Sequence, residues 1–422
     1  MKQPFFGRKN SMTFWRDSSL VWIGTMLAAA LAFVVQVILA RHLDLASFGE
    51  MTNTYAIASL IGIFGFQGVG EVIMRHPGHV RRAFAIRAFL ALFSLASLLA
   101  IAVVLLFEAS GVDSVLMLAF VPFVIVHVGL LAGMVDAQIG HRPLGIAAWP
   151  TLLQVGRLIG LLIVIAIGGS PILIPLLWAA TLLLPGFLGT KSLLRRSQSH
   201  HSGDSNGPKN TPAIIRAALP LSTARVIEFA EIQLPVVLAA MIFDASGAGL
   251  VAASLTLIQG ILLLPIAVFQ RLLRARFFQW ADKDRRRLVR TSLLGGGGMV
   301  LIGLVFTIVG RPFAEQIVVF IFGSEFSQAG DFLMRLVTLL PIWLAAVAVN
   351  AALVNKRDAD LRAVLQMVGI GLLVAGSISG YGDQPLDSIF LGIALNQSLL
   401  LVGGLVILVM PSPRRDKGVT ES

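Results

Sequence analysis

Long runs of apolar residues constrain this chain more than any other feature of its sequence. The run from Ser18 to Ala40 exceeds the roughly 20 residues that a helix needs to cross the hydrocarbon core of a bilayer. Similar runs recur along the chain, and only 13% of its residues are charged, against about 25% in soluble proteins. Inside lipid every backbone polar group must be paired within its own segment, so the sequence predicts an all-α polytopic membrane protein.

The apolar runs predict about twelve spans in two groups of six. We expect an N-terminal lobe at 1–190, a cytoplasmic linker at 191–212, a C-terminal lobe at 213–410 and a tail at 411–422. The linker is polar and cannot bury a core. The expected spans are 18–40, 52–74, 84–107, 114–134, 144–167, 171–190, 213–243, 247–269, 289–310, 328–353, 361–380 and 386–410.

Two further segments need an interpretation. The run Pro312–Phe322 is apolar but too short to span, so we expect it in the membrane interface. The first run follows a basic N-terminus, and no small-residue cleavage site follows a short apolar core. It is therefore predicted to be a retained helix rather than a signal peptide.

Positive charge alternates from loop to loop. One set of loops holds Arg75, Arg81, Arg82, Arg87, Arg142, Lys191, Arg195, Arg196, Lys209, Arg216, Arg271, Arg274, Arg276, Lys283, Arg285, Arg286, Arg287, Arg290, Lys356, Arg357, Arg362, Arg414, Arg415 and Lys417. The other set holds only Arg41 and Arg311. The protein is expected in the cell inner membrane. Because Lys and Arg accumulate on the cytoplasmic side of a membrane protein, both termini are expected in the cytoplasm. This bias explains the net charge of +11 without a nucleic-acid partner.

The two groups of helices carry a faint internal repeat. The segment LASFGEMTNTYAIASLIG follows the first run, and the similar segment DASGAGLVAASLTLIQG follows the seventh. In this alignment Gly49 stands opposite Gly249. Each half begins on the same side of the membrane, so the sequence predicts parallel repeats related by a pseudo-twofold axis along the membrane normal.

Two stretches resemble a known family. The first contains Ala40-Arg41-His42-Leu43, then Phe48-Gly49, and closes with the segment from Gly68 to Arg75. The second, FDASGAGLVAASLTLIQGILLLPIAVFQ, is similar to the hairpin of the seventh and eighth helices in the same family. Both resemble the polysaccharide flippases of the multidrug/oligosaccharidyl-lipid/polysaccharide exporter (MOP) superfamily. The Gly-x-Tyr that often follows the seventh helix in that family is Gly249-Leu250-Val251 here.

The resemblance implies a transporter rather than an enzyme. Such a protein flips a polyprenyl-pyrophosphate-linked oligosaccharide from the cytoplasmic to the periplasmic leaflet for surface polysaccharide biosynthesis. Its two lobes rock around a central cavity, and the lipid tail stays in the membrane. The resemblance implies no cofactor, and it makes polysaccharide polymerase and export proteins candidate partners.

Charged residues inside predicted spans are costly and need a reason. Arg157 lies in the middle of the fifth span, Arg225 in the seventh and Arg335 in the outer third of the tenth. A guanidinium group binds phosphate oxygens through two parallel hydrogen bonds. All three are therefore candidate substrate-binding residues in a cationic cavity, and Arg157 is the strongest. The alternative is that they neutralise acids, as Arg225 could neutralise Glu228 on its own helix.

Acidic residues in the spans are candidates for coupling to an ion gradient. Glu228 and Glu231 follow Arg225 at spacings of three, which place neighbours on one helix face. Buried acids in transporters often mark proton relays. The basic segment Arg271–Arg290 is predicted to be a loop that contacts anionic lipids, or alternatively one that captures a pyrophosphate headgroup.

Other classes of function find less support in the sequence. The chain has no cysteine, and neither a metal-ligand spacing nor a serine-nucleophile motif occurs, so no metal site or catalytic residue is expected. A membrane polymerase or ligase of the polysaccharide pathway usually has substantial outer loops, whereas the outer loops here are short. A cation-coupled drug exporter of the same superfamily is the nearer alternative, although arginines in the cavity would repel cationic drugs.

Overall fold

The computed structural model describes residues 11–75, 82–106, 113–196, 210–380 and 385–410, and within these ranges it is helical and contains no strand. Its long helices are α1 (Ser11–His42), α2 (Leu45–Arg75), α3 (Arg82–Leu106), α4 (Ser114–Ile139), α5 (Pro143–Ala166), α6 (Leu173–Arg196), α7 (Thr211–Ile242), α8 (Ala245–Pro265), α10 (Arg285–Gly310), α12 (Ser327–Asn350), α13 (Lys356–Ile378) and α14 (Pro385–Val409). Each predicted span overlaps one of them. The all-α polytopic fold is therefore confirmed.

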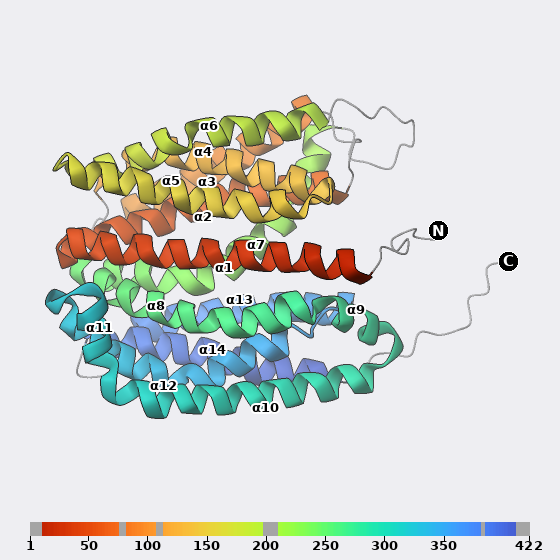
Figure 1. The fold of residues 1–422 in the computed structure, drawn as a ribbon. Helices are drawn as coiled ribbons and strands as arrows, with labels where there is room; N and C mark the ends of the chain where they lie inside the picture. The colour runs from red at the N-terminus through yellow and green to blue at the C-terminus, as the bar shows by residue number, and fades with distance from the viewer. Residues whose placement is uncertain (1–10, 76–81, 107–112, 197–209, 381–384, 411–422) are drawn as a thin grey trace.

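The described residues contain ten helical segments long and apolar enough to cross a membrane, and these include every long helix except α3 and α7. In α3 the apolar helix found in this way is shorter, Ala83–Leu99, and α7 contains four charged residues. Both helices nevertheless lie within the bundle beside the others (Figure 1). The α1 start and the α14 end lie at one end of the bundle, which we call the terminal end. The other we call the opposite end.

The helices pack in two groups (Figure 1). In the first group α4 packs against α6, α1 against α5, and α2 against both α3 and α4. In the second group α12 packs against α14, α10 against α12, and α8 against α12. The pairs α4–α6 and α12–α14 are equivalent under the predicted repeat, as are α2–α4 and α8–α12. The packing is thus that of two parallel repeats, and the exact lobe boundaries stay a prediction.

Equivalent residues of the repeat make equivalent helix caps. The carboxylate of Asp44 accepts a hydrogen bond from the backbone N–H of Ser47 (2.8 Å) at the start of α2. The carboxylate of Asp244 accepts one from the N–H of Gly247 (2.7 Å) at the start of α8. The bond from Ser47 lowers the pKa of Asp44. Because this cap starts the helix at Leu45, our prediction that the second span begins at 52 was seven residues late.

The two halves meet at the opposite end through the glycines that the repeat aligns. A Cβ added to Gly49 would lie 1.7 Å from the carbonyl oxygen of Ala245 and 2.6 Å from the nitrogen of Gly249. A Cβ added to Gly249 would lie 2.6 Å from the carbonyl oxygen of Leu45. Residues related by a twofold axis can touch only if they lie near that axis. The predicted pseudo-twofold therefore passes close to this crossing of α2 and α8.

Further contacts between the halves surround this crossing. The Arg41 guanidinium donates to the main-chain oxygens of Phe320 and Ile321, the latter at 2.7 Å, in the last turn of the short helix α11 (Ala314–Phe322). The rings of Phe48 and Phe326 pack edge to face with centroids 5.4 Å apart. Cations are favourable at helix C-termini, so Arg41 links α1 to the second half of the chain.

Towards the terminal end, α2 leaves α8 and packs against α7. A Cβ on Gly68 would lie 2.2 Å from the carbonyl oxygen of Ala218, and the Gly68 N–H donates to Ser222 Oγ (3.1 Å). Glycine allows this close approach because it has no side chain. The helix α2 therefore joins both halves along most of its length, and its neighbours at the two ends are α8 and α7.

The segment predicted as a basic loop at Arg271–Arg290 is instead largely helical. After Pro265 the chain continues as a π-helix (Ile266–Leu272), and α9 (Arg274–Lys283) then leads directly to α10. Phe277 of α9 is buried, and its ring centroid lies 6.1 Å from that of Trp280. Our loop prediction was wrong because α9 has an apolar face that buries Phe277 and packs Trp280 against it.

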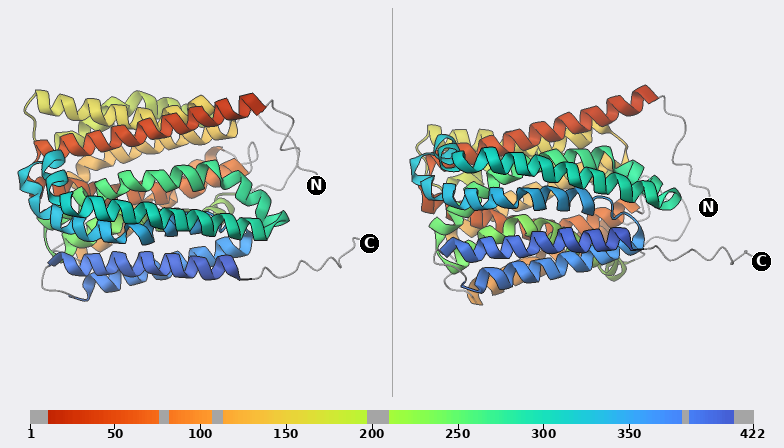
Figure 2. Two further views of the ribbon diagram at one scale, coloured as in Figure 1. Left: turned by 60° about the horizontal axis from the view of Figure 1, so that its bottom comes forward. Right: turned by 90° about the horizontal axis from the view of Figure 1, so that it is seen from below.

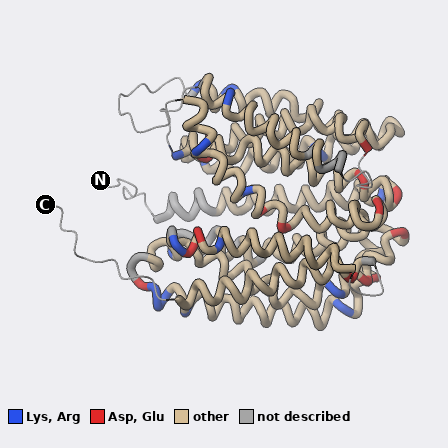
Figure 3. Tube along the Cα trace, turned by 180° about the vertical axis from the view of Figure 1, so that it is seen from behind, with Lys and Arg blue, Asp and Glu red and all other residues tan. Residues whose placement is uncertain are grey.

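Charge divides the two ends of the bundle. Lys and Arg gather at the terminal end, and most of the acidic residues of the loops lie at the opposite end (Figure 3). The short helix α11 and its flanking 3₁₀ turns (Arg311–Phe313 and Ser324–Phe326) occupy the opposite end, as Figure 2 also shows. This is the segment predicted to lie in the membrane interface, and its Phe320 is largely exposed.

Arg285 of α10 forms hydrogen bonds to α13 and to the end of α14 at the terminal end. Its Nη1 donates to the buried carboxylate of Asp358 in α13 (3.0 Å). Its Nη2 donates to the main-chain oxygens of Ile407, Leu408 and Met410 at the end of α14, at 3.3, 3.2 and 3.0 Å. The arginine thus neutralises a buried acid and satisfies carbonyl groups that a helix end leaves unpaired.

We predict that Arg285→Ala destabilises the protein by about 3 kcal/mol, because it leaves the Asp358 carboxylate buried without a cation. Thermal unfolding of the purified protein in detergent checks this. Arg286→Ala is the matched control, since Arg286 is an exposed neighbour on the same helix. Equal melting temperatures for the two variants would contradict the prediction.

Candidate substrate-binding cavity

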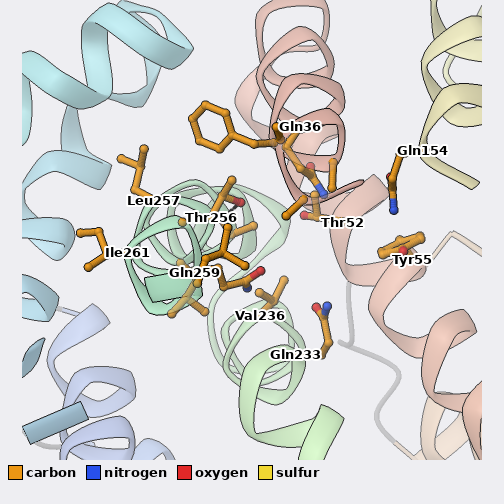
Figure 4. Close-up of a pocket in the computed structure, with 18 of the residues that line it drawn as sticks. Gln36, Thr52, Tyr55, Gln154, Gln233, Val236, Thr256, Leu257, Gln259 and Ile261 are labelled. Atoms are coloured by element: carbon orange, nitrogen blue, oxygen red, sulfur yellow. Dashed lines mark hydrogen bonds between the residues drawn. The ribbon is translucent and has the colours of Figure 1, made fainter. Parts of the chain in front are cut away.

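A cavity of about 700 Å³ lies between the two groups of helices. Its walls come from α1, α2 and α5 on one side and from α7, α8 and α10 on the other. Most of the polar side chains that line it are uncharged and carry amide or hydroxyl groups (Figure 4), namely Gln36, Thr52, Tyr55, Gln154, Gln233, Thr256 and Gln259. Within the described chain, Arg157 is the one charged residue of this lining.

Arg157 is held between two aromatic rings. Its guanidinium carbon lies 4.6 Å from the ring centroid of Tyr55 and 4.4 Å from that of Trp178. The side chain is only 2% exposed. Stacking on aromatic faces stabilises a buried guanidinium. The three residues come from α5, α2 and α6, so the packing of the first half positions the charge.

The hydrogen-bonding capacity of Arg157 is largely unused. Its Nη1 donates to Gln154 Oε1 (3.1 Å) and lies 3.5 Å from the Tyr55 hydroxyl. Its Nε and Nη2 are buried, and neither has a hydrogen-bond partner in the described part of the chain. No described acid forms an ion pair with it. Leaving buried donors of a charged group unsatisfied costs free energy, so this geometry suits a site that an anionic ligand completes.

The other two candidate arginines lie in other cavities. Arg225 Nη1 pairs with Glu228 Oε2 at 2.8 Å, as the alternative interpretation of the sequence predicted. Both line a smaller cavity of about 360 Å³ between α2, α4 and α7. Arg335 pairs with Asp387 of α14 and lines a cavity of about 580 Å³ at the opposite end. Neither arginine lines the cavity of Arg157.

The two candidate coupling residues have different surroundings. Glu228 accepts from Arg225 and also from Arg362 of α13 (2.7 Å), so its charge is compensated twice. Glu231 lies one helical turn further along α7 with the Gln366 side chain against its carboxyl group. Its Oε1 is buried, and within the described residues it has no hydrogen-bond partner. Glu231 is therefore the acid with capacity left for a proton or a cation.

The aromatic partners of Arg157 were not predicted from the sequence. Tyr55 is one of only two tyrosines in the chain, and a tyrosine in the middle of an apolar run is a signal that could have found it. No local pattern pointed to Trp178, which lies in a different span. Phe229 was also missed, although it lines both the 700 Å³ and the 360 Å³ cavities.

Comparison of the whole fold with solved structures finds transporters. No family model and no curated protein matches the sequence. The lipid II flippase MurJ, in an inward closed conformation, aligns over 92% of this chain and 86% of its own, with a TM-score of 0.63 and 16% identity. A multidrug resistance MATE family transporter of the MOP superfamily, in an inward-facing conformation, aligns over 90% and 93%, with a TM-score of 0.60 and 14% identity.

The fold of this chain is similar to the folds of these transporters. The Vibrio cholerae MATE transporter VcmN, in a mutant form, supports the same assignment, with a TM-score of 0.57 and 13% identity over 93% of this chain and 95% of its own. The MOP-type fold expected from the two resembling stretches is thus confirmed. By their names, these neighbours are transporters or flippases and not enzymes. That this chain is a polysaccharide flippase of the MOP superfamily stays a prediction.

Proposed function

We propose that this protein is a flippase that moves a polyprenyl-pyrophosphate-linked oligosaccharide across the membrane by alternating access of its two halves. The observation that carries this proposal is the Arg157 guanidinium, buried at the wall of the inter-half cavity with two unused donors. A pyrophosphate supplies the negative charge and the acceptor oxygens that these donors lack. The substrate anion therefore binds at Arg157 while the cavity is open to one side.

The outer wall of the cavity suits a substrate with a lipid tail. Phe306 of α10 lines the cavity and is 39% exposed on the surface of the bundle. On α1, Met26, Ala29, Ala30, Ala32 and Phe33 line the cavity with apolar side chains, and Gln36 adds an amide. An apolar wall that reaches the lipid-facing surface lets a tail stay in the membrane while the headgroup enters the cavity.

The remaining polar groups of the cavity suit a saccharide. Gln36, Gln233 and Gln259 offer amides from three different helices, and Figure 4 shows their side chains grouped around the cavity. Amides both donate and accept hydrogen bonds, as sugar hydroxyls require. The alternative function is the export of cationic drugs, which Arg157 disfavours because its charge would repel them in a site shielded from water.

The experiment that tests this function follows the substrate itself. In cells depleted of the protein, the lipid-linked oligosaccharide should accumulate in the cytoplasmic leaflet, and the wild-type protein should reverse the accumulation. Unchanged sidedness together with a change in drug or dye sensitivity would reject the flippase and support the drug exporter. Sidedness is read from the access of an impermeant sugar-oxidising reagent to spheroplasts and to inverted vesicles.

We further propose that Glu231 binds the coupling proton or cation and that Glu228 holds α7 in register with α13. Support comes from the unpartnered Oε1 of Glu231 within the described chain and from the two arginines on Glu228. A proton or cation bound at Glu231 changes the charge between α7 and α13 and thereby favours one packing of these helices over another.

Accordingly, Glu231→Gln is expected to abolish gradient-driven transport in proteoliposomes and to retain exchange of substrate at equilibrium. The amide keeps the size of the carboxyl group but cannot change its charge. Separate pH and sodium gradients identify the ion. Glu325→Gln, an exposed acid at the opposite end, is the control. Accumulation at the wild-type rate by Glu231→Gln would assign the coupling elsewhere.

We place the protein in the inner membrane with the terminal end, and hence both termini, in the cytoplasm. Support comes from the Lys and Arg at that end (Figure 3). Near α9, Arg276, Arg286 and Arg290 are exposed, so anionic lipid headgroups are the proposed partners of this surface. Polymerase and export proteins of the same pathway are proposed as functional partners.

A further inference from the structure

The smaller cavity between α2, α4 and α7 differs from the cavity of Arg157 in the polar side chains that line it. Its volume of about 360 Å³ falls within the range of about 300–1,000 Å³ for small-molecule sites. Gln67 of α2 and Gln138 of α4 line it, and their side-chain amides make no hydrogen bond to the described part of the chain. Both are only partly exposed. The cavity thus presents two free amides from two neighbouring helices.

The charges around this cavity already compensate one another. Glu71 accepts from Arg75 of its own helix at 2.8 Å. Glu228 accepts from Arg225 and from Arg362. An ionic ligand would have to compete with these pairs, whereas a neutral ligand that forms hydrogen bonds need not. The cavity therefore favours an uncharged group rich in hydroxyls.

The position of Phe229 connects this cavity to the cavity of Arg157. Phe229 lines both of them, so it stands between the two. A flat aromatic ring offers an apolar face to the C–H face of a pyranose. An elongated headgroup could place its charged end at Arg157 and pass Phe229 with a sugar ring.

We propose that the cavity of Gln67, Gln138 and Phe229 is a second substrate site, which binds uncharged sugar units distal to the pyrophosphate. This proposal rests on the function proposed above. The Gln67 and Gln138 amides hydrogen-bond the sugar hydroxyls, Phe229 stacks against a ring, and Arg157 holds the anion. Substrates with longer saccharides gain affinity here that a bare prenyl pyrophosphate does not.

Two probes and the detergent-purified full-length protein test the second site. One probe is a short prenyl pyrophosphate, and the other is the same molecule bearing a disaccharide. The double variant Gln67→Leu/Gln138→Leu is expected to bind the disaccharide probe about tenfold more weakly, from two lost hydrogen bonds. Its affinity for the bare prenyl pyrophosphate stays unchanged. Arg157→Ala weakens both probes, and the exposed Gln279→Leu of α9 weakens neither.

The possible failures are distinguishable. If the double variant weakens both probes equally, or neither, the second site is rejected while Arg157 keeps its role. If the wild-type protein binds neither probe, both the proposed function and the second site are rejected. If the double variant does not fold, Gln67→Asn and Gln138→Asn withdraw each amide by one methylene and are subject to the same two criteria.

Discussion

Replacing Arg157 with alanine is expected to reduce the affinity for a pyrophosphate headgroup at least about 100-fold and to abolish transport. The estimate follows from two charge-assisted hydrogen bonds, each contributing about 1.5–3 kcal/mol. Arg157→Lys is expected to recover little, because an ammonium group cannot make the two parallel bonds of a guanidinium. Binding of a prenyl pyrophosphate to the purified protein measures the affinity, and flipping in proteoliposomes measures transport.

A structural role for Arg157 makes a different prediction from a substrate role. Arg157→Met keeps an unbranched side chain between the Tyr55 and Trp178 rings and removes both the charge and the unsatisfied donors. Under the substrate role this variant melts no earlier than the wild type and does not transport. Normal transport by Arg157→Met would reject the substrate role. Early melting with normal headgroup affinity would assign the arginine to packing alone.

Replacing Gly49 with valine is expected to separate the two halves at the opposite end. Even a Cβ there would lie 1.7 Å from the Ala245 carbonyl oxygen, and the nearest atoms all belong to the α8 backbone, which cannot move aside as a side chain would. Forcing extra methyl groups into a packed contact costs about 1–3 kcal/mol or more. The crossing of α2 and α8 therefore cannot form, and the cavity opens towards the opposite end.

The absence of cysteine from the chain makes this opening measurable. Thr52 is buried at the cavity wall, and its hydroxyl bonds only to the Phe48 and Gly49 carbonyls of its own helix among the described residues. In a Thr52→Cys background, Gly49→Val should increase labelling by an impermeant maleimide from the opposite side. Gly297→Val is the matched control, because a Cβ at Gly297 meets nothing within 4 Å. Labelling at the control level would show that the crossing does not close this end.

The sequence predicted the helices well and the site in part. Each predicted span became a long helix, because a chain in lipid has no other way to pair its backbone. Arg157 could be recognised as a candidate because a charge deep in an apolar run is costly wherever it lies. Arg225 and Arg335 met the same criterion, and yet the structure pairs them with Glu228 and Asp387 in cavities away from Arg157. The pairing of Arg225 with Glu228 follows from spacing along one helix, but Asp387 lies on another helix, and spacing along α12 could not reveal it.

Composition and periodicity by themselves determined the all-helical membrane fold, the number of long helices, and the alignment of Gly49 with Gly249. The helices follow from the need to pair the backbone within each segment in lipid. The alignment of the glycines follows from an internal repeat that can still be recognised in the amino-acid sequence. Only the tertiary structure decided that these two glycines touch, that Tyr55 and Trp178 enclose Arg157, and that Phe229 stands between two cavities. Each of these is a contact between helices distant in sequence, and its energy depends on how whole helices pack rather than on the residues beside it in the chain.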